Sequence, residues 1–590
     1  KKIFEKTSTD NPNYLLLLNK LFENIFQKKV HGLSEFALSV LMPLQQFEID
    51  INWTEIIRKN NTETYDLLAM VNKVSLHEKL TFAEAEEFFY ISFITTVSTN
   101  LVLRELATEN LYLIGRNFPK QIIKFCNLCY KFQDVNAIES LMASLCGTVL
   151  FVREEDLTKN VMSFLINDFI LNWNNTHIGI IEYILTISEF AFLKYGLDYS
   201  SQLHFNKSFT IPELSTDDKQ YSRFSSSLAG VDMYDFVKYQ IAHISSDNYH
   251  KRDTFTENDC IKIILNRVKE NGYNETLFDP INKLFREDDR YRYGRGSKIK
   301  FYAEKYLWQA YFEFTGYLFL ENKLNSEGEN RYRCLDIYFD PTFPKLPSRN
   351  QVIADCFFPV KDGNIQEWIN SPNQIFIDKY YIHKIFTNDE WVLLSASINQ
   401  EGKENDTRFN LYTTAFLIEN NKIDVLEKDI DDETYHSGDA THFYNIYAGE
   451  LAWSKFIKDR ENYYDNEKYS LTELVWDYRW SSWSNNRYEN PSFPFLNTEI
   501  ANTNGLHFCL KDLSYYNLNN EQVTKIMWSE SAELYYIRKD LLDKILKEQE
   551  KDLVWYQFVS KYGEFGKYND NKLNPSYKDL RKLLKYNCKK

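Results

Sequence analysis

The sequence predicts a mainly α-helical protein, in which an irregular, α-solenoid-like helical array is followed by an α+β C-terminal domain. Three observations predict this fold class. Gly (18) and Pro (13) are scarce in a chain of 590 residues, which favours long helices over a turn-dense β protein. Apolar residues recur at helical spacing through the first third. After about residue 330, short β-like runs alternate with loops rich in Asn, Asp and Gly.

Residues 1–200 are predicted to form consecutive helices joined by short turns. The first begins after Asn11-Pro12 and places Leu15, Leu18 and Phe22 at helical spacing. Helices of this length joined by brief turns are typical of stacked helical pairs, although no fixed-period repeat occurs. The further helices are expected over residues 33–48, 62–75, 82–107, 118–132, 136–151, 157–173 and 178–195.

Residues 201–329 are predicted to form a mixed, mostly helical connector. A helix over Asp259–Glu270 should end at Asn271-Gly272, a common helix stop, and Asp279-Pro280 should open another. The most conspicuous helix runs from Phe301 to Asn322. Its apolar side chains cover most of its circumference, so we expect it to be buried on most sides; they are Leu307, Trp308, Ala310, Tyr311, Phe312, Phe314, Tyr317 and Leu318.

Residues 330–590 are predicted to form the α+β domain, with the boundary near residues 325–332. Strand-like runs occupy residues 333–339, 391–397 and 408–414. Near the end of the chain, a helix over Asp540–Glu550 should lie between strands over Leu534–Arg538 and Leu553–Val559.

Charge and cysteine usage restrict the class of partner and the compartment. The net charge of −15 makes a nucleic-acid partner unlikely, since a general phosphate-neutralising field is lacking. The eight Cys have no disulfide-framework spacing, which indicates a reducing cytoplasm. The most apolar stretch, residues 88–103, is too short and polar to span a bilayer, so no membrane association is expected. Because the chain begins at Lys1 without Met, we expect it to be the middle of a longer polypeptide.

Motifs for phosphate binding and nucleophilic catalysis do not occur in the sequence. A P-loop needs G-x-x-x-x-G-K-[S/T] ahead of a helix, and the nearest run, Gly294-Arg-Gly-Ser-Lys298, has the wrong spacing. Neither the dinucleotide fingerprint G-x-G-x-x-G nor G-x-S-x-G is present. No catalytic residue and no cofactor are therefore predicted for this chain.

Two groups of residues are candidate metal sites, and each also has a simpler interpretation. Cys126 and Cys129 form a C-x-x-C, but a structural zinc site needs four ligands, so two buried residues on one helix are expected instead. His436 and His442 lie among acidic residues in a loop-like segment and could hold a divalent metal. A metal-dependent enzyme with this site remains an alternative to a non-catalytic chain; the acidic residues are Asp431, Asp432, Glu433 and Asp439.

Two surfaces are predicted binding candidates. A basic patch is interrupted by acidic residues, and it either forms a solvated loop with internal ion pairs or contacts nucleic acid or an acidic protein surface; it comprises Arg290, Arg292, Arg295 and Lys298. A second cluster combines the residue types that dominate protein–protein hot spots, with a core aromatic cluster as the alternative. Its residues are Trp476, Tyr478, Arg479, Trp480, Trp483 and Arg487.

The C-terminal half resembles a region of the large bacterial STAND-type NTPases of antiviral defence, the Avs (AVAST) group. Many such proteins carry a basic-Gly-Lys-Lys-Tyr-Gln-Trp-Ile-Ala-x-x-Glu segment, which Lys305, Tyr306, Trp308, Ala310 and Glu313 match. The intervening residues Ala303, Glu304, Leu307 and Gln309 depart from it. Weaker echoes are the runs 473–480, 537–546 and 553–559, so the resemblance covers about residues 290–565.

This resemblance implies a sensor region whose ATPase and N-terminal effector lie outside the sequence. The ATP and Mg²⁺ of such a protein would bind in that other part, so no catalytic residue transfers onto this chain. Family members bind phage proteins, self-associate and activate the effector. The expected function is therefore binding of a foreign protein in a cytoplasmic, bacterial defence system, with a passive interaction scaffold as a further alternative.

Overall fold

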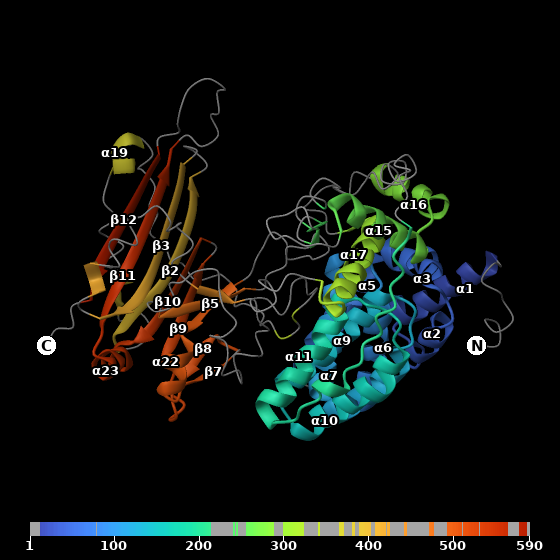
Figure 1. The fold of residues 1–590 in the computed structure, drawn as a ribbon, viewed down its shortest axis with the longest axis horizontal. Coiled ribbons are helices and arrows are strands. Elements are labelled where there is room, and N and C mark those ends of the chain that lie inside the picture. Colours follow the sequence, from blue (N-terminus) through green and yellow to red (C-terminus); the bar gives the residue numbers. More distant parts are fainter. Residues whose placement is uncertain are drawn as a thin grey trace. The chain divides into compact units, whose positions relative to one another are not determined.

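The described residues of the computed structural model fall into two compact units, which divide between residues 343 and 344. We call them the helical unit and the sheet unit, and Figure 1 shows both. The predicted boundary near residues 325–332 lies outside the described residues. The structure describes residues 12–77, 80–213, 236, 240–241, 244–245, 255–287, 299–323, 340, 342, 365–370, 380–383, 389–402, 407–419, 422–424, 442–444, 471–476, 492–509, 511–529, 531–563 and 577–586.

The helical unit confirms the prediction of consecutive helices in the first part of the chain. Its principal helices are α1 (Pro12–Phe22), α2 (Ser34–Leu41), α3 (Gln46–Ile49), α4 (Glu55–Lys59), α5 (Asn61–Leu76), α6 (Phe82–Thr95), α7 (Leu101–Asn117), α8 (Ile122–Cys129), α9 (Val135–Val152), α10 (Glu155–Phe164), α11 (Ile178–Tyr195), α15 (Glu257–Glu270), α16 (Glu275–Glu287) and α17 (Tyr302–Leu320). Short π-helical turns η2 (Glu23–Gln27), η3 (Asp50–Thr54) and η5 (Leu165–Ile170) extend or connect several of them.

The long helices pack in chain order. Helix α5 contacts α7, α7 contacts α9, and α9 contacts α11. Helix α6 packs against α7 and α8, and α10 packs against α8 and α11. Helix α17 then contacts α11, α15 and α16. A helix that comes late in the chain therefore completes the packing of helices formed much earlier.

Three predicted helices differ from the observed ones. The expected helix 33–48 is divided into α2 and α3. The expected helix 82–107 is broken, because α6 ends at Thr95 and the Asn100 side chain caps α7 by accepting from the backbone N–H of Val102 at 3.1 Å. Asn at this position satisfies an N–H that has no partner within the helix. The helix predicted to open at Asp279-Pro280 begins earlier, at Glu275, and contains Pro280.

Helix α9 is the one described helix that is long and apolar enough to cross a membrane by length and composition. Its apolar character has another explanation, because 89% of the helix is buried inside the protein. Neighbours α7 and α11 pack against it on either side in the chain order given above. We therefore interpret α9 as the central core helix of the helical unit.

The sheet unit is built around an antiparallel sheet, as the α+β prediction requires. The strand order is β12 (Tyr577–Lys585), β11 (Asp552–Tyr562), β3 (Thr407–Ile418), β2 (Trp391–Gly402), β10 (Ala532–Arg538) and β9 (Thr524–Ser529), while β1 (Ile382–His383) also pairs with β2. Helix α23 (Lys539–Gln549) joins β10 to β11. The predicted runs 391–397, 408–414, 534–538 and 553–559 all lie within these strands, and α23 confirms the predicted helix 540–550.

Smaller elements complete the described part of the sheet unit. A second sheet orders β4 (His442–Tyr444), β5 (Thr472–Trp476) and β6 (Ser492–Leu496), and a third pairs β7 (His507–Cys509) with β8 (Ser514–Tyr516). Two short helices, α19 (Ile365–Asn370) and α22 (Thr498–Thr503), accompany them. In the main sheet, nearly every residue of β11 is buried. Both faces of this interior strand are therefore covered, which explains why its apolar run Leu553–Tyr556 does not alternate with polar residues.

Candidate functional site

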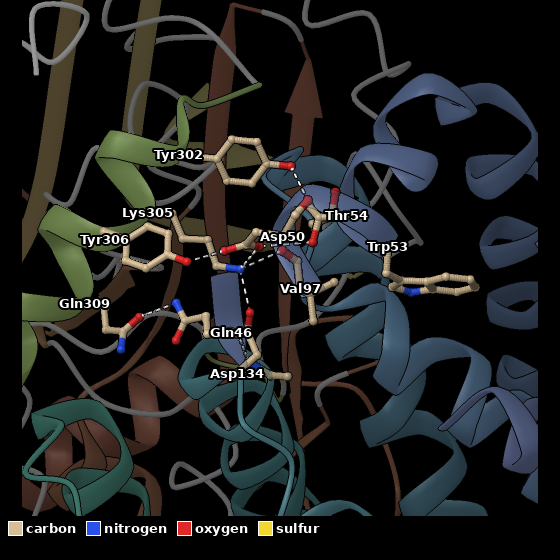
Figure 2. Close-up of polar contacts among 12 residues, drawn as sticks. Gln46, Asp50, Trp53, Thr54, Val97, Asp134, Tyr302, Lys305, Tyr306 and Gln309 are labelled. Atoms are coloured by element: carbon tan, nitrogen blue, oxygen red, sulfur yellow. Dashed lines mark hydrogen bonds and ion pairs between the residues drawn. The ribbon is translucent and has the colours of Figure 1, made fainter. Parts of the chain in front are cut away.

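Helix α17 carries a stripe of polar side chains into the core of the helical unit. Tyr302, Lys305 and Gln309 project from α17 toward residues of the N-terminal helices, and Figure 2 shows them pointing to Asp50, Asp134 and Gln46. Positions three and four apart lie on one helical face, so Tyr302, Lys305, Gln309 and Glu313 form one continuous stripe. We call it the α17 polar stripe. Its charged members Lys305 and Glu313 are both 0% exposed.

The first half of the α17 polar stripe is centred on Lys305. Its ammonium nitrogen lies 2.6 Å from Oδ1 of Asp50 and 2.5 Å from Oδ2 of Asp134, and it also donates to the Val97 carbonyl at 3.2 Å. Asp50 is the first residue of η3, and Asp134 caps the N-terminus of α9. One lysine therefore connects three segments that are far apart in the sequence.

Two tyrosines of α17 complete this first half. The Tyr306 hydroxyl donates to Oδ2 of Asp50 at 2.9 Å. The Tyr302 hydroxyl lies 2.9 Å from Oε1 of Glu55 and 3.1 Å from the Asp50 carbonyl. Glu55 in turn pairs with Arg58 through both carboxylate oxygens. The start of α17 is thus joined to η3 and α4 by buried hydrogen bonds to charged groups. Such bonds are stronger than hydrogen bonds between neutral groups.

The carboxyl of Asp50 differs from an ordinary aspartate. Its pKa is raised to about 6, because burial penalises the carboxylate more strongly than the Lys305 ammonium stabilises it, and the nearby Asp134 adds to the rise. For Lys305, burial opposes the charged form, but the Asp134 and Asp50 carboxylates outweigh it and raise the pKa of the amine. Lys305 is therefore protonated, and Asp50 is the group that can gain or lose a proton here.

The second half of the α17 polar stripe is centred on Glu313. Arg267 of α15 donates from Nε to Oε2 of Glu313 at 2.5 Å, and Asn271 donates to the same oxygen at 3.0 Å. The other oxygen, Oε1, accepts from Asn175 at 2.6 Å and from Gln309 at 3.0 Å. Burial raises the pKa of Glu313, but Arg267 and the amide donors outweigh it, so the pKa is lowered overall. Glu313 is therefore ionised.

Gln309 connects the two halves. Its side-chain carbonyl accepts from Nε2 of Gln46 at 2.6 Å while its own amide donates to Glu313. Gln46 begins α3, four residues before Asp50. The hydrogen bonds therefore run without a break from α3 through Gln309 to Glu313, and on to Arg267 of α15.

Close backbone contact fixes the C-terminal half of α17. The Thr176 hydroxyl donates to the Glu313 carbonyl at 2.7 Å. One turn further on, a Cβ at Gly316 would overlap the Thr176 carbonyl. The neighbouring His177 is fully buried against Phe312, and burial lowers its pKa to about 4. Gly316 is therefore required for the close approach of α17 to the segment before α11.

The chemistry of the α17 polar stripe is that of a structural clamp. Its charged groups are buried and each already holds several partners, so none is free to exchange a proton with a bound substrate. Buried ion pairs of this kind orient elements more than they stabilise the fold. Among the residues that the structure describes, no three His, Cys, Asp or Glu side chains are placed to hold a metal ion.

The structure describes only one of the predicted binding residues. Trp476 ends β5, whereas Tyr478, Arg479, Trp480, Trp483 and Arg487 lie outside the described residues. The basic patch, Arg290, Arg292, Arg295 and Lys298, also lies outside them. Of the predicted acidic metal cluster, His442 falls on β4, which pairs in parallel with β5; His436 and its acidic neighbours are not described.

The C-x-x-C motif is described in full. Cys126 and Cys129 are buried on α8, which confirms the expectation of two buried residues on one helix. Burial raises the pKa of both thiols. A thiol needs a lowered pKa to act as nucleophile or metal ligand at neutral pH, so these two cysteines are packing residues.

Sequence reasoning identified half of the α17 polar stripe. Lys305, Tyr306 and Glu313 were singled out through the resemblance, but their partners were not. Asp50, Asp134 and Arg267 carry no comparable signal in the sequence. A polar residue every third or fourth position inside an otherwise apolar helix was the available clue, because such residues need buried partners.

No family model and no curated protein matches this chain.

Proposed function

We propose that this chain is the sensor region of a larger bacterial anti-phage defence protein, which binds a foreign protein and relays the signal to an ATPase and effector. The observation that carries the proposal is the position of the resemblance residues. Lys305, Tyr306 and Glu313 are the polar residues of the matching segment, and each one makes buried polar contacts within the α17 polar stripe. These buried contacts give the polar residues of the matching segment a structural role, which supports the resemblance to the STAND-type NTPases.

The packing of the helical unit suits recognition of a protein. Helices α5, α7, α9 and α11 contact one another in chain order, and we infer an irregular α-solenoid from this arrangement. Arrays of this type offer an extended surface to a partner. The α17 polar stripe joins α3, η3, α9 and α15 to one helix. A shift of one of these elements on binding would therefore be transmitted to the others through α17.

The compartment and assembly follow from the same proposal. Cysteines 126, 129 and 509 form no disulfide bond within the described part of the chain, which fits the proposed reducing cytoplasm. Self-association of several copies would bring the effectors together. Neither ATP nor Mg²⁺ would bind to this chain, since both would belong to the ATPase part.

Capture from infected cells tests the proposal. The affinity-tagged chain is expressed in bacteria that are infected with a panel of phages or mock-infected, and bound proteins are identified by mass spectrometry. We expect a phage-encoded protein to be enriched only after infection. The purified phage protein should then form a stoichiometric complex with the purified chain.

Two outcomes would contradict the sensor proposal. Equal capture of the same host proteins with and without infection would indicate a passive scaffold. A captured phage protein that fails to bind the purified chain would show that the capture was indirect.

A further inference from the structure

One helix of the helical unit contains a π-helical turn between two α-helical segments. Helix α3 (Gln46–Ile49), η3 (Asp50–Thr54) and α4 (Glu55–Lys59) follow one another without a gap, and the backbone at both junctions keeps right-handed helical angles. In a π turn each hydrogen bond closes over one residue more than in an α-helix, so η3 accommodates one extra residue. Such turns are rare and are frequently found at functional sites. We call the continuous helix Gln46–Lys59 the η3 helix.

Helix α17 contacts both ends of η3. The Tyr302 hydroxyl lies 3.1 Å from the backbone carbonyl oxygen of Asp50, the first residue of the turn, and 2.9 Å from Oε1 of Glu55, the residue that follows the turn. Lys305 and Tyr306 each donate to one carboxyl oxygen of Asp50, at 2.6 and 2.9 Å (Figure 2). Because one hydroxyl contacts the residues at both ends, α17 fixes the spacing between the start and the end of the π turn.

The middle of η3 is held by Trp53, which points away from Lys305 in Figure 2. The Trp53 side chain is fully buried, and its indole N–H donates to the Ile94 carbonyl of α6 at 2.9 Å. Its ring also lies against Phe22 and Phe26. The surroundings of the Trp53 indole therefore depend on how the residues of the turn are placed against α1, η2 and α6.

The π turns η2 and η5 have different surroundings from η3. The first residue of η2, Glu23, pairs with Lys20 and Lys28, which are close to it in sequence. The acidic residue of η5, Asp168, is exposed. Asp50 of η3 is instead fully buried and binds a lysine that lies 255 residues further along the chain. Of these three turns, η3 is therefore the one whose form depends on a distant helix.

We propose that the η3 helix has two states: contact with α17 selects the π turn, and withdrawal of α17 lets the helix become regularly α-helical. The α form is by far the commoner form of a helical backbone, so the π turn needs contacts that favour it. The contacts of Tyr302 require the spacing of the π turn, and contacts that differ between two states are what shifts their populations. Buried hydrogen bonds to the charged groups Asp50 and Glu55 are strong enough for this purpose.

A change of η3 to the α form would move α4. Without the π turn, the residues after it are displaced by one position along the helix, which turns α4 by about 100°. Glu55 and Arg58 of α4 form a buried ion pair, and this rotation would carry the pair out of its buried position. Helix α4 contacts α5, the first of the long helices that pack in chain order. A role of this movement in signalling a bound protein rests on the proposed function, whereas the two states of the η3 helix do not.

Fluorine NMR of Trp53 tests the two states in the whole purified chain. The tryptophans are replaced by 5-fluorotryptophan, and the Trp53→Phe chain assigns the resonance, which should be single in the original chain. Tyr302→Phe/Tyr306→Phe removes the hydroxyl contacts with the η3 helix and keeps the lysine ion pairs, so no buried charge is left unpaired. This variant should show two sharp Trp53 resonances. Tyr65→Phe/Tyr317→Phe removes two hydroxyls elsewhere, one of them on α17, and should show a single resonance.

Deletion of one residue distinguishes a change of register from a general loosening of the helix. Without Asn52 the η3 helix has no extra residue, so it has only the α form. The second resonance should therefore disappear when this deletion is combined with Tyr302→Phe/Tyr306→Phe. The matched control deletes the exposed Asn167 from the π turn η5 and should leave both resonances of Tyr302→Phe/Tyr306→Phe in place.

Three results would overturn the two-state proposal. The first is a single Trp53 resonance in Tyr302→Phe/Tyr306→Phe, or a second one only at the position of the unfolded chain. The second is a second resonance that persists after deletion of Asn52. The third is unfolding of the chain that lacks Asn52, because a regular α-helix could then not replace the turn. Failure of the sensor proposal is recognised separately, since no phage protein would be captured while the two Trp53 resonances still appeared.

Discussion

Lys305 and Glu313 are both fully buried and lie eight residues apart on one helix, yet their surroundings differ. Lys305 lies between two carboxylates, so the three groups together carry a net charge of −1 when both aspartates are ionised. Glu313 faces one guanidinium and three amides. The guanidinium neutralises the carboxylate charge, and the amide N–H groups stabilise it further by hydrogen bonds. The first arrangement raises the pKa of an acid, and the second lowers one. Burial raises both, and the neighbouring like charge at Asp50 or the additional amide donors at Glu313 decide the direction.

The largest effect is expected from Lys305→Met. This change leaves Asp50 and Asp134 buried without their cation, which should lower the free energy of unfolding of the helical unit by about 3–5 kcal/mol. Lys194→Met makes the same replacement at an exposed position of α11 and should change little. Hydrogen exchange of the α17 amides measures the effect locally. Equal protection in both variants would show that the Lys305 ion pairs do not hold α17.

The next effect is a pH dependence that differs between the two ends of the α17 polar stripe. Asp50 has a higher pKa in the folded than in the unfolded chain, so its stabilising contribution is present at low pH and is lost as the pH rises from about 4 to about 6. A rise from pH 4 to pH 7 should therefore remove about 2 kcal/mol of stability through this group. Glu313 has a lowered pKa, so its contribution is present above the unfolded pKa and is lost in acid.

Asp50→Asn isolates the Asp50 contribution to this pH dependence. The difference in unfolding free energy between the original chain and Asp50→Asn should fall as the pH rises through 6. The measurement is chemical denaturation followed at several pH values. A difference that does not change with pH would show that Asp50 is ionised throughout this range.

A smaller effect is expected from Glu313→Gln, about 2 kcal/mol, because it removes a charge but keeps the shape and an acceptor oxygen. Arg267 is 20% exposed and can turn toward water, which limits the cost. Arg267→Met/Glu313→Gln should recover part of the loss, since no buried charge then remains unpaired. Thermal unfolding of Glu313→Gln, Arg267→Met and the double variant measures this coupling. Purely additive losses would contradict a direct charge pair.

The smallest effect is expected from Gly316→Ala, a loss of about 1–2 kcal/mol. Its Cβ meets a backbone carbonyl of Thr176, which cannot rotate away, and the overpacking cost of 1–3 kcal/mol is partly offset by better helix propensity. Gly115→Ala on α7 is the matched control, because there the obstacle is the rotatable hydroxyl of Thr148. Equal melting temperatures of the two variants would show that the Thr176 segment yields.

Much of the secondary structure could be predicted from spacing alone. The helix expected at residues 178–195 is α11, and the strand expected at 553–559 lies within β11. Apolar periodicity is local, so it appears in the sequence without knowledge of the fold. The break between α6 and α7 was missed, because it depends on caps by Thr and Asn inside a stretch that looks continuously apolar.

The candidate site was less accessible to prediction. Lys305, Tyr306 and Glu313 stood out within their helix, whereas their partners Asp50, Asp134 and Arg267 come from three other parts of the chain. Two aspartates among 84 acidic residues carry no signal until the fold places them beside Lys305. The two predicted surface clusters, in contrast, were visible because their residues are adjacent in sequence.

The sequence by itself determined the approximate positions of most helices in the first 200 residues and of four strands of the main sheet, and that α17 would be buried. Only the tertiary structure decided what its polar residues do. Lys305 meets Asp50 across 255 residues and Asp134 across 171, and Asp134, which marks a helix start in the sequence, uses one oxygen to cap α9 and the other to bind Lys305. Burial periodicity repeats every few residues and is written locally, whereas the pairing of buried charges depends on which distant segments pack together.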